Sequence, residues 1–136
     1  MRGLSFMELM FVLLILGVIL SLALPGYRRQ VLAAHRAEAT QALHDLHLAQ
    51  ERFRSRQTRY ARSLQELGQP ALSANGRYRL SVAQSTAEGY VLEADAQGQQ
   101  AQDHRCSRLR LTQSFGQVTH QGMGASMEQS AGCWPQ

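Results

Sequence analysis

The sequence predicts an α+β protein in which one long N-terminal helix packs on a small antiparallel sheet of three to four strands. Residues 4–56 are apolar all round at first and then apolar along a single stripe, as expected for a long helix with two parts. From residue 78 onward, apolar and polar residues instead alternate with a period of two, which is typical of half-buried strands. The 136 residues are enough for one small domain beside such a helix.

The first part of the helix, residues 4–25, has the length and composition of a membrane-spanning segment. About 20 apolar residues are needed for a helix to cross a bilayer, and this stretch reaches that length. One carboxylate, Glu8, lies near its start. A charge in a membrane segment costs roughly 2.5–3.5 kcal/mol on insertion scales, so Glu8 is by default a functional hypothesis. The small residue Gly3 precedes the apolar run rather than following it, which is not the order of a secretory signal.

These N-terminal residues resemble the type IV pilins and their relatives in type II secretion. The family pattern is a glycine at a cleaved bond, four mostly apolar residues, a glutamate and a long apolar helix with a proline. Gly3, Glu8 and Pro25 match this pattern, with Leu4 standing where phenylalanine is usual, after a very short leader of residues 1–3. The resemblance implies that a prepilin peptidase cuts after Gly3 and that the new amino group of Leu4 is methylated. It also implies that Glu8 pairs with such an amino group, on its own chain or on a neighbour, during assembly with other pilin subunits.

The second part of the helix, residues 26–56, is amphipathic. An apolar residue recurs every seven positions and forms the stripe Leu32, Ala39, Leu46, Phe53 and Tyr60. Such a stripe is the face of a helix that packs on a small domain. Pro25 removes one backbone hydrogen bond where the two parts meet. Two interpretations stay open for it: a mild kink, or a segment that extends when the subunit leaves the membrane for a filament.

Residues 57–136 are expected to form the globular head. Ser63 and Glu66 have the spacing of a capping box that opens a short helix ending at Gly68. Three alternating stretches predict strands around residues 78–83, 90–95 and 108–112, with a hairpin loop at 85–89. A short fourth strand is expected near residues 117–120. The polar run 98–105 is expected to be a surface loop, and the Gly/Ser-rich tail 122–132 is expected to be held only through Cys133.

The two cysteines, Cys106 and Cys133, predict one disulfide in an oxidising compartment. Closing that loop contributes roughly 3–4 kcal/mol in the chain-entropy model. A zinc site with His104 and His120 and a pair of free thiols are the alternatives, but the close ligand pairs of structural zinc sites are absent from the sequence. The region around both cysteines also resembles PilE-type minor pilins. The matching residues are Cys106, the run Leu109-Arg-Leu-Thr-Gln113, and the ending Gly132-Cys133-Trp134.

All 14 basic residues are arginine, and the net charge is +4. One hypothesis is a DNA-binding patch on the outer face of the sheet, formed by Arg77, Arg79, Arg105, Arg108 and Arg110. The competing interpretation is that Glu93 and Asp95 lie on a strand between the others and neutralise the arginines as cross-strand pairs. Base stacking needs exposed aromatic residues, for which Phe115 and Trp134 are the candidates. The arginines from 52 to 62 are interpreted as a solvated helix end and loop.

No other pattern points to chemistry. His44 and His47 are three residues apart on the polar face of the helix and are expected to be solvated rather than metal ligands. No arrangement of nucleophile, base and orienting group is apparent, so we expect neither an enzyme nor a cofactor or metal.

The resemblance therefore implies a minor type IV pilin that helps to initiate or build a pilus filament for adhesion, twitching motility or DNA uptake. It implies a single-pass precursor in the inner membrane with a periplasmic head, later assembled in the cell-surface pilus. Arg28, Arg29 and Arg36 follow the apolar segment, which by charge statistics alone favours a cytoplasmic head. The alternatives are a type II secretion pseudopilin, a DNA-receptor pilin for natural transformation, and an uncleaved membrane protein.

Overall fold

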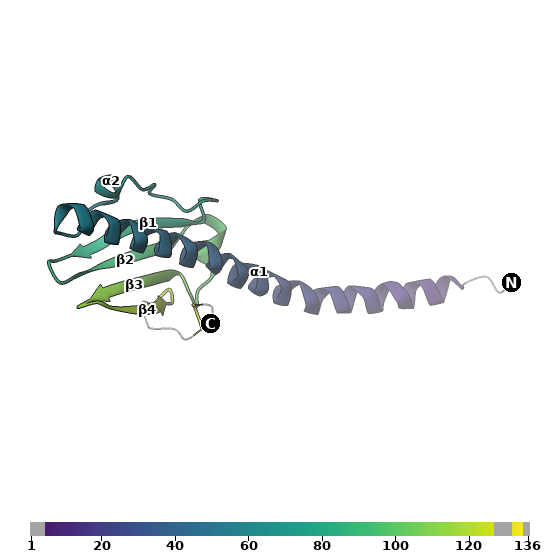
Figure 1. Cartoon of the computed structure of the whole chain (residues 1–136). Helices are drawn as coiled ribbons and strands as arrows, with labels where there is room; N and C mark the ends of the chain where they lie inside the picture. Colours follow the sequence, from purple (N-terminus) through teal and green to yellow (C-terminus); the bar gives the residue numbers. More distant parts are fainter. Residues whose placement is uncertain (1–4, 127–131, 135–136) are drawn as a thin grey trace. The chain divides into compact units, whose positions relative to one another are not determined.

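The computed structural model describes residues 5–126 and 132–134, and it confirms the α+β class. The chain divides into two compact units, residues 1–31 and 32–136, which are treated separately below. The elements are α1 (Phe6–Gln57), α2 (Leu64–Leu67), β1 (Tyr78–Ser85), β2 (Gly89–Ala96), the 3₁₀-helix η1 (Gly98–Gln102), β3 (Arg108–Ser114) and β4 (Gln117–Met123) (Figure 1).

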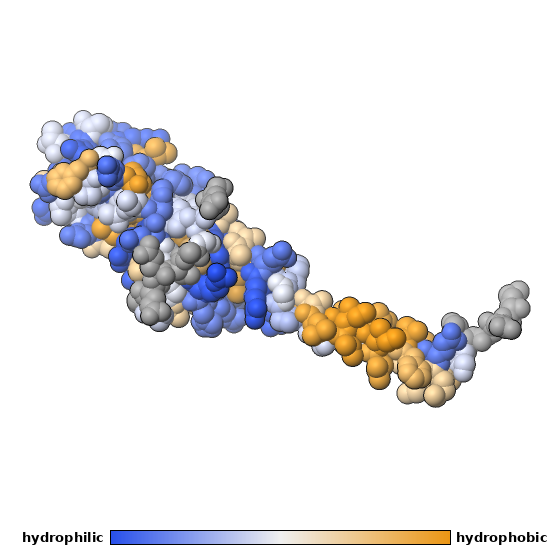
Figure 2. Space-filling model, turned by 90° about the horizontal axis from the view of Figure 1, so that it is seen from below, coloured by the Kyte–Doolittle hydropathy of each residue, from blue (hydrophilic) through white to orange (hydrophobic). Residues whose placement is uncertain are grey.

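In the N-terminal unit, α1 exposes apolar side chains in every direction. Every large apolar residue described between Phe6 and Leu24 is at least 48% exposed. Much of this segment is orange on the face shown in Figure 2. By length and composition, the helix is long and apolar enough to cross a membrane. Such a surface is stable only in lipid or against other apolar helices.

In the head, α1 buries one face of its remaining length. The buried positions are Ala39, Thr40, Leu43, Leu46 and Gln50. They follow the predicted stripe, whose outer members Leu32 and Phe53 are only partly buried. The helix ends at Gln57, one residue beyond the predicted end, and Thr58 then takes a positive φ of 57°. Tyr60 is therefore buried from the loop that follows the helix and not from the helix itself.

The short helix α2 begins and ends as the capping signature predicts. The hydroxyl of Ser63 accepts a hydrogen bond from the backbone N–H of Glu66, and Gly68 closes the helix in the left-handed region. One detail differs from the standard capping box. The Glu66 carboxylate accepts from the backbone N–H of Arg62, one residue before the N-cap, and it also binds the guanidinium of Arg59.

The four strands form one antiparallel sheet in the order β1-β2-β3-β4. Leu80 of β1 pairs with Ala94 of β2, which in turn pairs with Leu109 of β3. The next outward-facing row joins Ser81, Glu93, Arg110 and Gln121 across all four strands. The predicted strand that carries the acids therefore does lie between the two arginine-bearing strands. The register slips once, between Val82 and Gln84.

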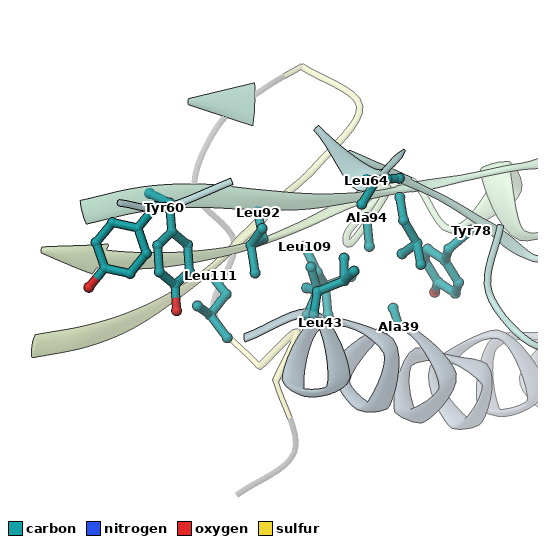
Figure 3. Packing of buried hydrophobic residues seen from close by; sticks show 12 residues of the cluster. Ala39, Leu43, Tyr60, Leu64, Tyr78, Leu92, Ala94, Leu109 and Leu111 are labelled. Carbon is teal, nitrogen blue, oxygen red and sulfur yellow. The ribbon is translucent and has the colours of Figure 1, made fainter. Parts of the chain in front are cut away.

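The core lies between α1 and the inner face of the sheet (Figure 3). Leu43 and Leu46 of the helix meet Leu92, Leu109 and Leu111 of the sheet, and all five are at most 1% exposed. The remaining members of the cluster are Ala39, Tyr60, Leu64, Tyr78, Leu80, Tyr90 and Ala94. The hydroxyl groups of Tyr60 and Tyr90 reach polar partners at one end of the core, whereas the buried hydroxyl of Tyr78 has no hydrogen-bond partner among the described residues.

For the C-terminal half, one sequence prediction is wrong, and the predicted fourth strand is confirmed with a different end. The run 98–105 is not a plain surface loop, because it contains η1 and buries Gln100 and Asp103. These polar groups bind α1, an association that sequence periodicity does not reveal. The fourth strand is also longer than expected, since β4 continues to Met123 and takes in Gly122 of the predicted tail. Residues 127–131 of that tail lie outside the described part of the chain.

The turn between β3 and β4 has an unusual conformation for its sequence. Only Phe115 and Gly116 lie between the paired residues Ser114 and Gln117, and both have positive φ values, 49° and 81°. Two-residue turns of this kind favour Asn-Gly, because asparagine and glycine tolerate the left-handed region. For a phenylalanine that conformation costs roughly 1–2 kcal/mol.

Candidate functional site

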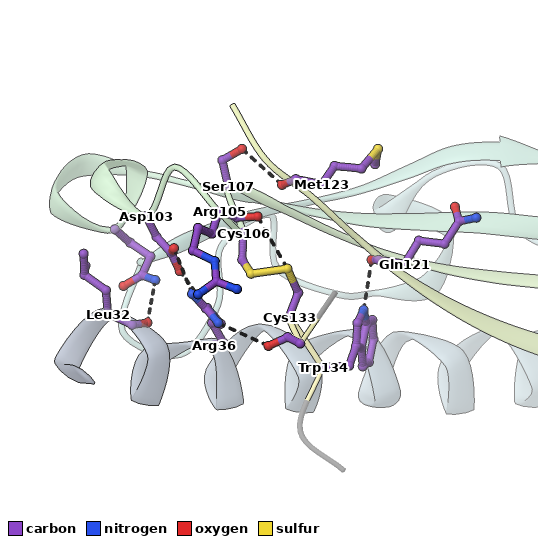
Figure 4. Close-up of a disulfide and its surroundings, with 12 residues drawn as sticks. Leu32, Arg36, Asp103, Arg105, Cys106, Ser107, Gln121, Met123, Cys133 and Trp134 are labelled. Carbon is purple, nitrogen blue, oxygen red and sulfur yellow. Dashed lines mark hydrogen bonds and ion pairs between the residues drawn. A yellow bond between two sulfur atoms is a disulfide. The ribbon is translucent and has the colours of Figure 1, made fainter. Parts of the chain in front are cut away.

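The first polar cluster joins α1 to the C-terminal segment of the chain. Cys106 and Cys133 form the disulfide that the sequence predicts, and both are almost fully buried. The indole N–H of Trp134 donates to the backbone carbonyl of Gln121 at 2.9 Å. Arg36 of α1 donates to the carbonyl of Gly132 (Figure 4). The residues around the disulfide are thus bound to both the helix and the sheet.

Buried polar groups hold η1 on the same helix. The Arg36 guanidinium binds the Asp103 carboxylate through two hydrogen bonds of 2.7 and 2.9 Å, and Asp103 is only 5% exposed. Gln100 donates to the carbonyl of Leu32 at 2.9 Å. A bidentate arginine–carboxylate pair of this kind fixes orientation as well as position. These groups are fully engaged inside the head, so they serve the fold and not a ligand.

The outer-face arginines are largely neutralised, as the competing interpretation predicted. Arg110 binds the Glu93 carboxylate, and Arg108 binds both Asp95 and Glu93. The hydrogen bond to Asp95 raises the pKa of Arg108 although burial acts against it. Arg77 is held by Glu38 at 2.6 Å. In the described residues, only Arg79 and Arg105 of the five proposed DNA-binding arginines have no carboxylate partner.

A different surface keeps its positive charge. The head ends where α1 stops and where the two hairpins turn, and these parts lie at one end of the sheet in Figure 1. We call residues 52–62, 86–88 and 115–116 the hairpin end. Residues 51–66 contain five arginines and two glutamates. Among the described residues, the exposed side chains of Arg52, Arg56 and Arg62 have no carboxylate within ion-pair distance.

The other two arginines of this segment lie on aromatic rings. The Arg54 guanidinium is 4.5 Å from the ring centroid of Tyr60 and also donates to its hydroxyl. Arg59 lies 5.1 Å from the ring centroid of Phe53. Stacking on Tyr60 holds the Arg54 guanidinium in place without neutralising it, whereas Arg59 is also paired with the Glu66 carboxylate. The sequence analysis interpreted the arginines from 52 to 62 as a solvated helix end and loop, and these side chains are indeed exposed. It overlooked that no acidic strand lies beside this segment.

Buried tyrosines fix the hairpin end to the helix. Tyr90, two residues into β2, packs its ring against Tyr60 at a centroid distance of 4.7 Å. Its hydroxyl donates to the Glu51 carboxylate and also contacts the ring of His47. Burial first, and then the Glu51 charge, raise the pKa of Tyr90, so the hydroxyl stays protonated. His47 is therefore engaged rather than simply solvated.

The two aromatic candidates for base stacking differ in access. Trp134 is half-buried, and its ring centroid lies 4.3 Å from that of His120 and 6.0 Å from that of His44. Burial, followed by the charges of His44 and His47, lowers the pKa of His120. Phe115, in contrast, is 83% exposed, more than any other large apolar residue in the described chain. Of these two candidates, Phe115 is therefore the one that is free to stack on a ligand.

The remaining predicted site residues are located as follows. Glu8 lies in the first turn of α1 and is exposed, and Pro25 lies inside the same helix. Gly3 and Leu4 lie outside the described residues. No group of three histidine, cysteine or acidic side chains is placed for a metal ion within residues 5–126 and 132–134. His104 is exposed, and the two cysteines are consumed by the disulfide.

One comparison with known proteins identifies a family. A family model described as type IV minor pilin ComP, DNA uptake sequence receptor, matches residues 25–110, which is more than half of the chain. The match runs from Pro25 to Arg110, the third residue of β3, and contains all five arginines of residues 52–62. No curated protein matches the chain.

Proposed function

This chain belongs to the ComP family of type IV minor pilins, and from that premise we propose that its head binds duplex DNA at the hairpin end. As a minor pilin it is a structural subunit, anchored in the membrane and assembled in the pilus. The family match favours the pilus over the secretion pseudopilin. The family's description also brings forward DNA reception, which the sequence had left as an alternative.

The DNA site is inferred from which arginines are paired with carboxylates and which are not. DNA presents a dense row of phosphates, and each phosphate contact made by an arginine releases condensed counterions. An arginine already bound to a carboxylate has less to gain from such a contact. On the outer face of the sheet, Arg108 and Arg110 are paired with Glu93 and Asp95. At the hairpin end, Arg52, Arg56 and Arg62 are exposed without such partners among the described residues.

Binding of the full chain to a labelled duplex, measured by fluorescence anisotropy in detergent over a range of salt concentrations, tests the site. We expect Arg52→Gln/Arg56→Gln to lower the slope of log affinity against log salt by about 2, because each phosphate contact contributes about 0.9. At 0.15 M salt the same pair of contacts accounts for roughly a 30-fold loss of affinity.

The matched control removes two charges from the surface that the sequence proposed. Arg79→Gln/Arg105→Gln takes away the two outer-face arginines that have no carboxylate partner, so it equals the first variant in net charge. We expect its slope to stay near that of the unchanged protein. A loss of slope in this control, with none in the hairpin-end variant, would place the DNA on the outer face of the sheet instead.

We further propose that the precursor is processed as the N-terminal resemblance implies. A prepilin peptidase cuts after Gly3, Leu4 is methylated, Glu8 pairs with such an amino group, and Pro25 lies in the helix through which subunits join. The precursor is then a single-pass protein of the inner membrane with a periplasmic head. The exposed apolar surface of residues 6–24 and the disulfide of the head support this.

The intact mass of the protein purified from its native membrane tests the processing. We expect the loss of Met1, Arg2 and Gly3, a gain of one methyl group, and a two-proton increase on reduction. A full-length, unmethylated and already reduced chain would contradict both processing and location. It would instead support the cytoplasmic head that the arginine distribution favours.

A further inference from the structure

The exposure and the backbone conformation of Phe115 are not explained by the fold of the head. It is 83% exposed, although burying an aromatic ring is one of the largest apolar gains a small domain can make. Its backbone takes the left-handed conformation in a two-residue turn, where asparagine would fit better. Neither core packing nor turn geometry therefore accounts for a phenylalanine here. A side chain kept in an unfavourable place without a structural reason indicates a function.

The turn that carries Phe115 is held in place by backbone hydrogen bonds. The backbone N–H of Phe115 donates to the carbonyl of Glu88 at 3.1 Å, which ties the β3–β4 turn to the β1–β2 turn. Ser114 and Gln117 close the turn as a strand pair directly behind it. The two hairpins thus support each other, so little conformational freedom of the turn remains to be lost when the ring contacts a ligand.

Phe115 also lies on the surface that keeps its positive charge. Two residues before it, Gln113 pairs with Tyr90, whose ring packs on Tyr60, and Tyr60 carries the Arg54 guanidinium. This chain of contacts connects the β3–β4 turn to the end of α1. The hairpin end thus carries both an exposed apolar ring and exposed arginines. Proteins use this combination to insert a wedge between base pairs while binding nearby phosphates.

We propose that Phe115 inserts between two base pairs of the bound duplex and unstacks that step. This inference rests on the proposed DNA-binding function and adds the residue that contacts bases. The arginines supply affinity that does not depend on sequence, whereas the wedge favours steps that are easily unstacked. Glu88 is the one carboxylate among the residues of the hairpin end, and it lies on the turn next to Phe115. Its charge repels phosphate, so the contact with DNA at these turns is made by the apolar ring.

The test compares Phe115→Asn and Phe115→Trp in the full chain with duplexes that carry 2-aminopurine at successive positions, since this base brightens when it is unstacked. With the unchanged protein, we expect the fluorescence to increase when 2-aminopurine stands at one particular base step. Phe115→Asn should bind about tenfold more weakly, within the range measured for losing one aromatic stacking contact. Its salt slope should not change, because no charge is removed. Phe115→Trp should keep both affinity and brightening.

The controls separate a wedge from a fold defect and from loss of the whole site. Phe115→Asn places the residue that the turn prefers, so its melting temperature should equal or exceed that of the unchanged protein. Leu48→Gln removes another exposed apolar side chain of the head and should bind DNA normally. If the unchanged protein binds no DNA, the proposed function fails. If Phe115→Asn binds and brightens normally, or loses only its association with other pilins, the wedge is refuted while DNA binding stands.

Discussion

Replacing Cys106 and Cys133 together by alanine is expected to lower the free energy of unfolding of the head by about 3–4 kcal/mol. The two residues are 27 positions apart, and the closed loop contains β3 and β4. Without the crosslink, the unfolded chain gains the entropy of that loop. The folded chain keeps its contacts but becomes less favoured. For a head with so small a core, this is a large share of the total stability.

Trp134 offers a direct measurement of this loss, because it is the single tryptophan and follows Cys133 directly. Its indole N–H binds Gln121 in the folded head, so its fluorescence reports whether the C-terminal segment is docked. Urea unfolding followed by this fluorescence should shift to lower denaturant in the double alanine variant and, equally, in the unchanged protein after reduction. A shift of less than 1 kcal/mol in both would mean that the polar contacts of Arg36 and Trp134 hold this segment without the disulfide.

Replacing Glu38 by glutamine is expected to cost about 2–3 kcal/mol at neutral pH, since several charge-assisted hydrogen bonds end on this one carboxylate. Glu38 accepts from the hydroxyl of Ser73, from the backbone and side-chain amides of Asn75, and from Arg77. It thereby fastens the segment before β1 to the middle of α1. Glutamine keeps the shape of the side chain but has no negative charge. Its NH2 group would also face the donors that bind the Glu38 carboxylate.

The same carboxylate predicts a pH dependence. Burial acts to raise the pKa of Glu38, but the hydrogen bonds from Ser73, Arg77 and Asn75 outweigh it and lower the pKa to about 2 from an ordinary 4.5. Because the folded pKa lies below the unfolded one, the contribution to stability is complete above pH 4.5 and is lost as pH falls from 4.5 towards 2. The difference in unfolding free energy between the unchanged protein and Glu38→Gln should therefore shrink over that range.

Glu66→Gln is the matched control for this experiment. Glu66 also binds an arginine and a backbone N–H, and the bond from Arg59 lowers its pKa, but the group is exposed to solvent. Exposed pairs are screened by water and contribute little. We expect its unfolding curve to follow that of the unchanged protein at every pH. A difference between Glu38→Gln and the unchanged protein that stays constant from pH 7 to pH 2 would show that the lost contacts are not those of the ionised carboxylate.

The contacts of Glu38 join segments that are distant in sequence, and such contacts are where sequence-based prediction was weakest. Local patterns were sufficient for the secondary structure. The stripe from Ala39 to Leu46 predicted the helix face, Ser63 and Gly68 predicted the ends of α2, and alternation predicted the strands. Such patterns are reliable because backbone periodicity and capping depend on residues only a few positions apart.

By itself, the sequence determined the helix, the strands, the pairing of the two cysteines and the resemblance to minor pilins. Only the tertiary structure decided which charges remain available. Arg108 and Arg110 became ion-pair partners because β2 lies beside β3, whereas Arg52 and Arg56 kept their charge because no acidic strand adjoins the end of α1. Whether an arginine is neutralised, or whether Phe115 is exposed, depends on neighbours far away in sequence. Strand order and packing set those neighbours, and local periodicity does not contain them.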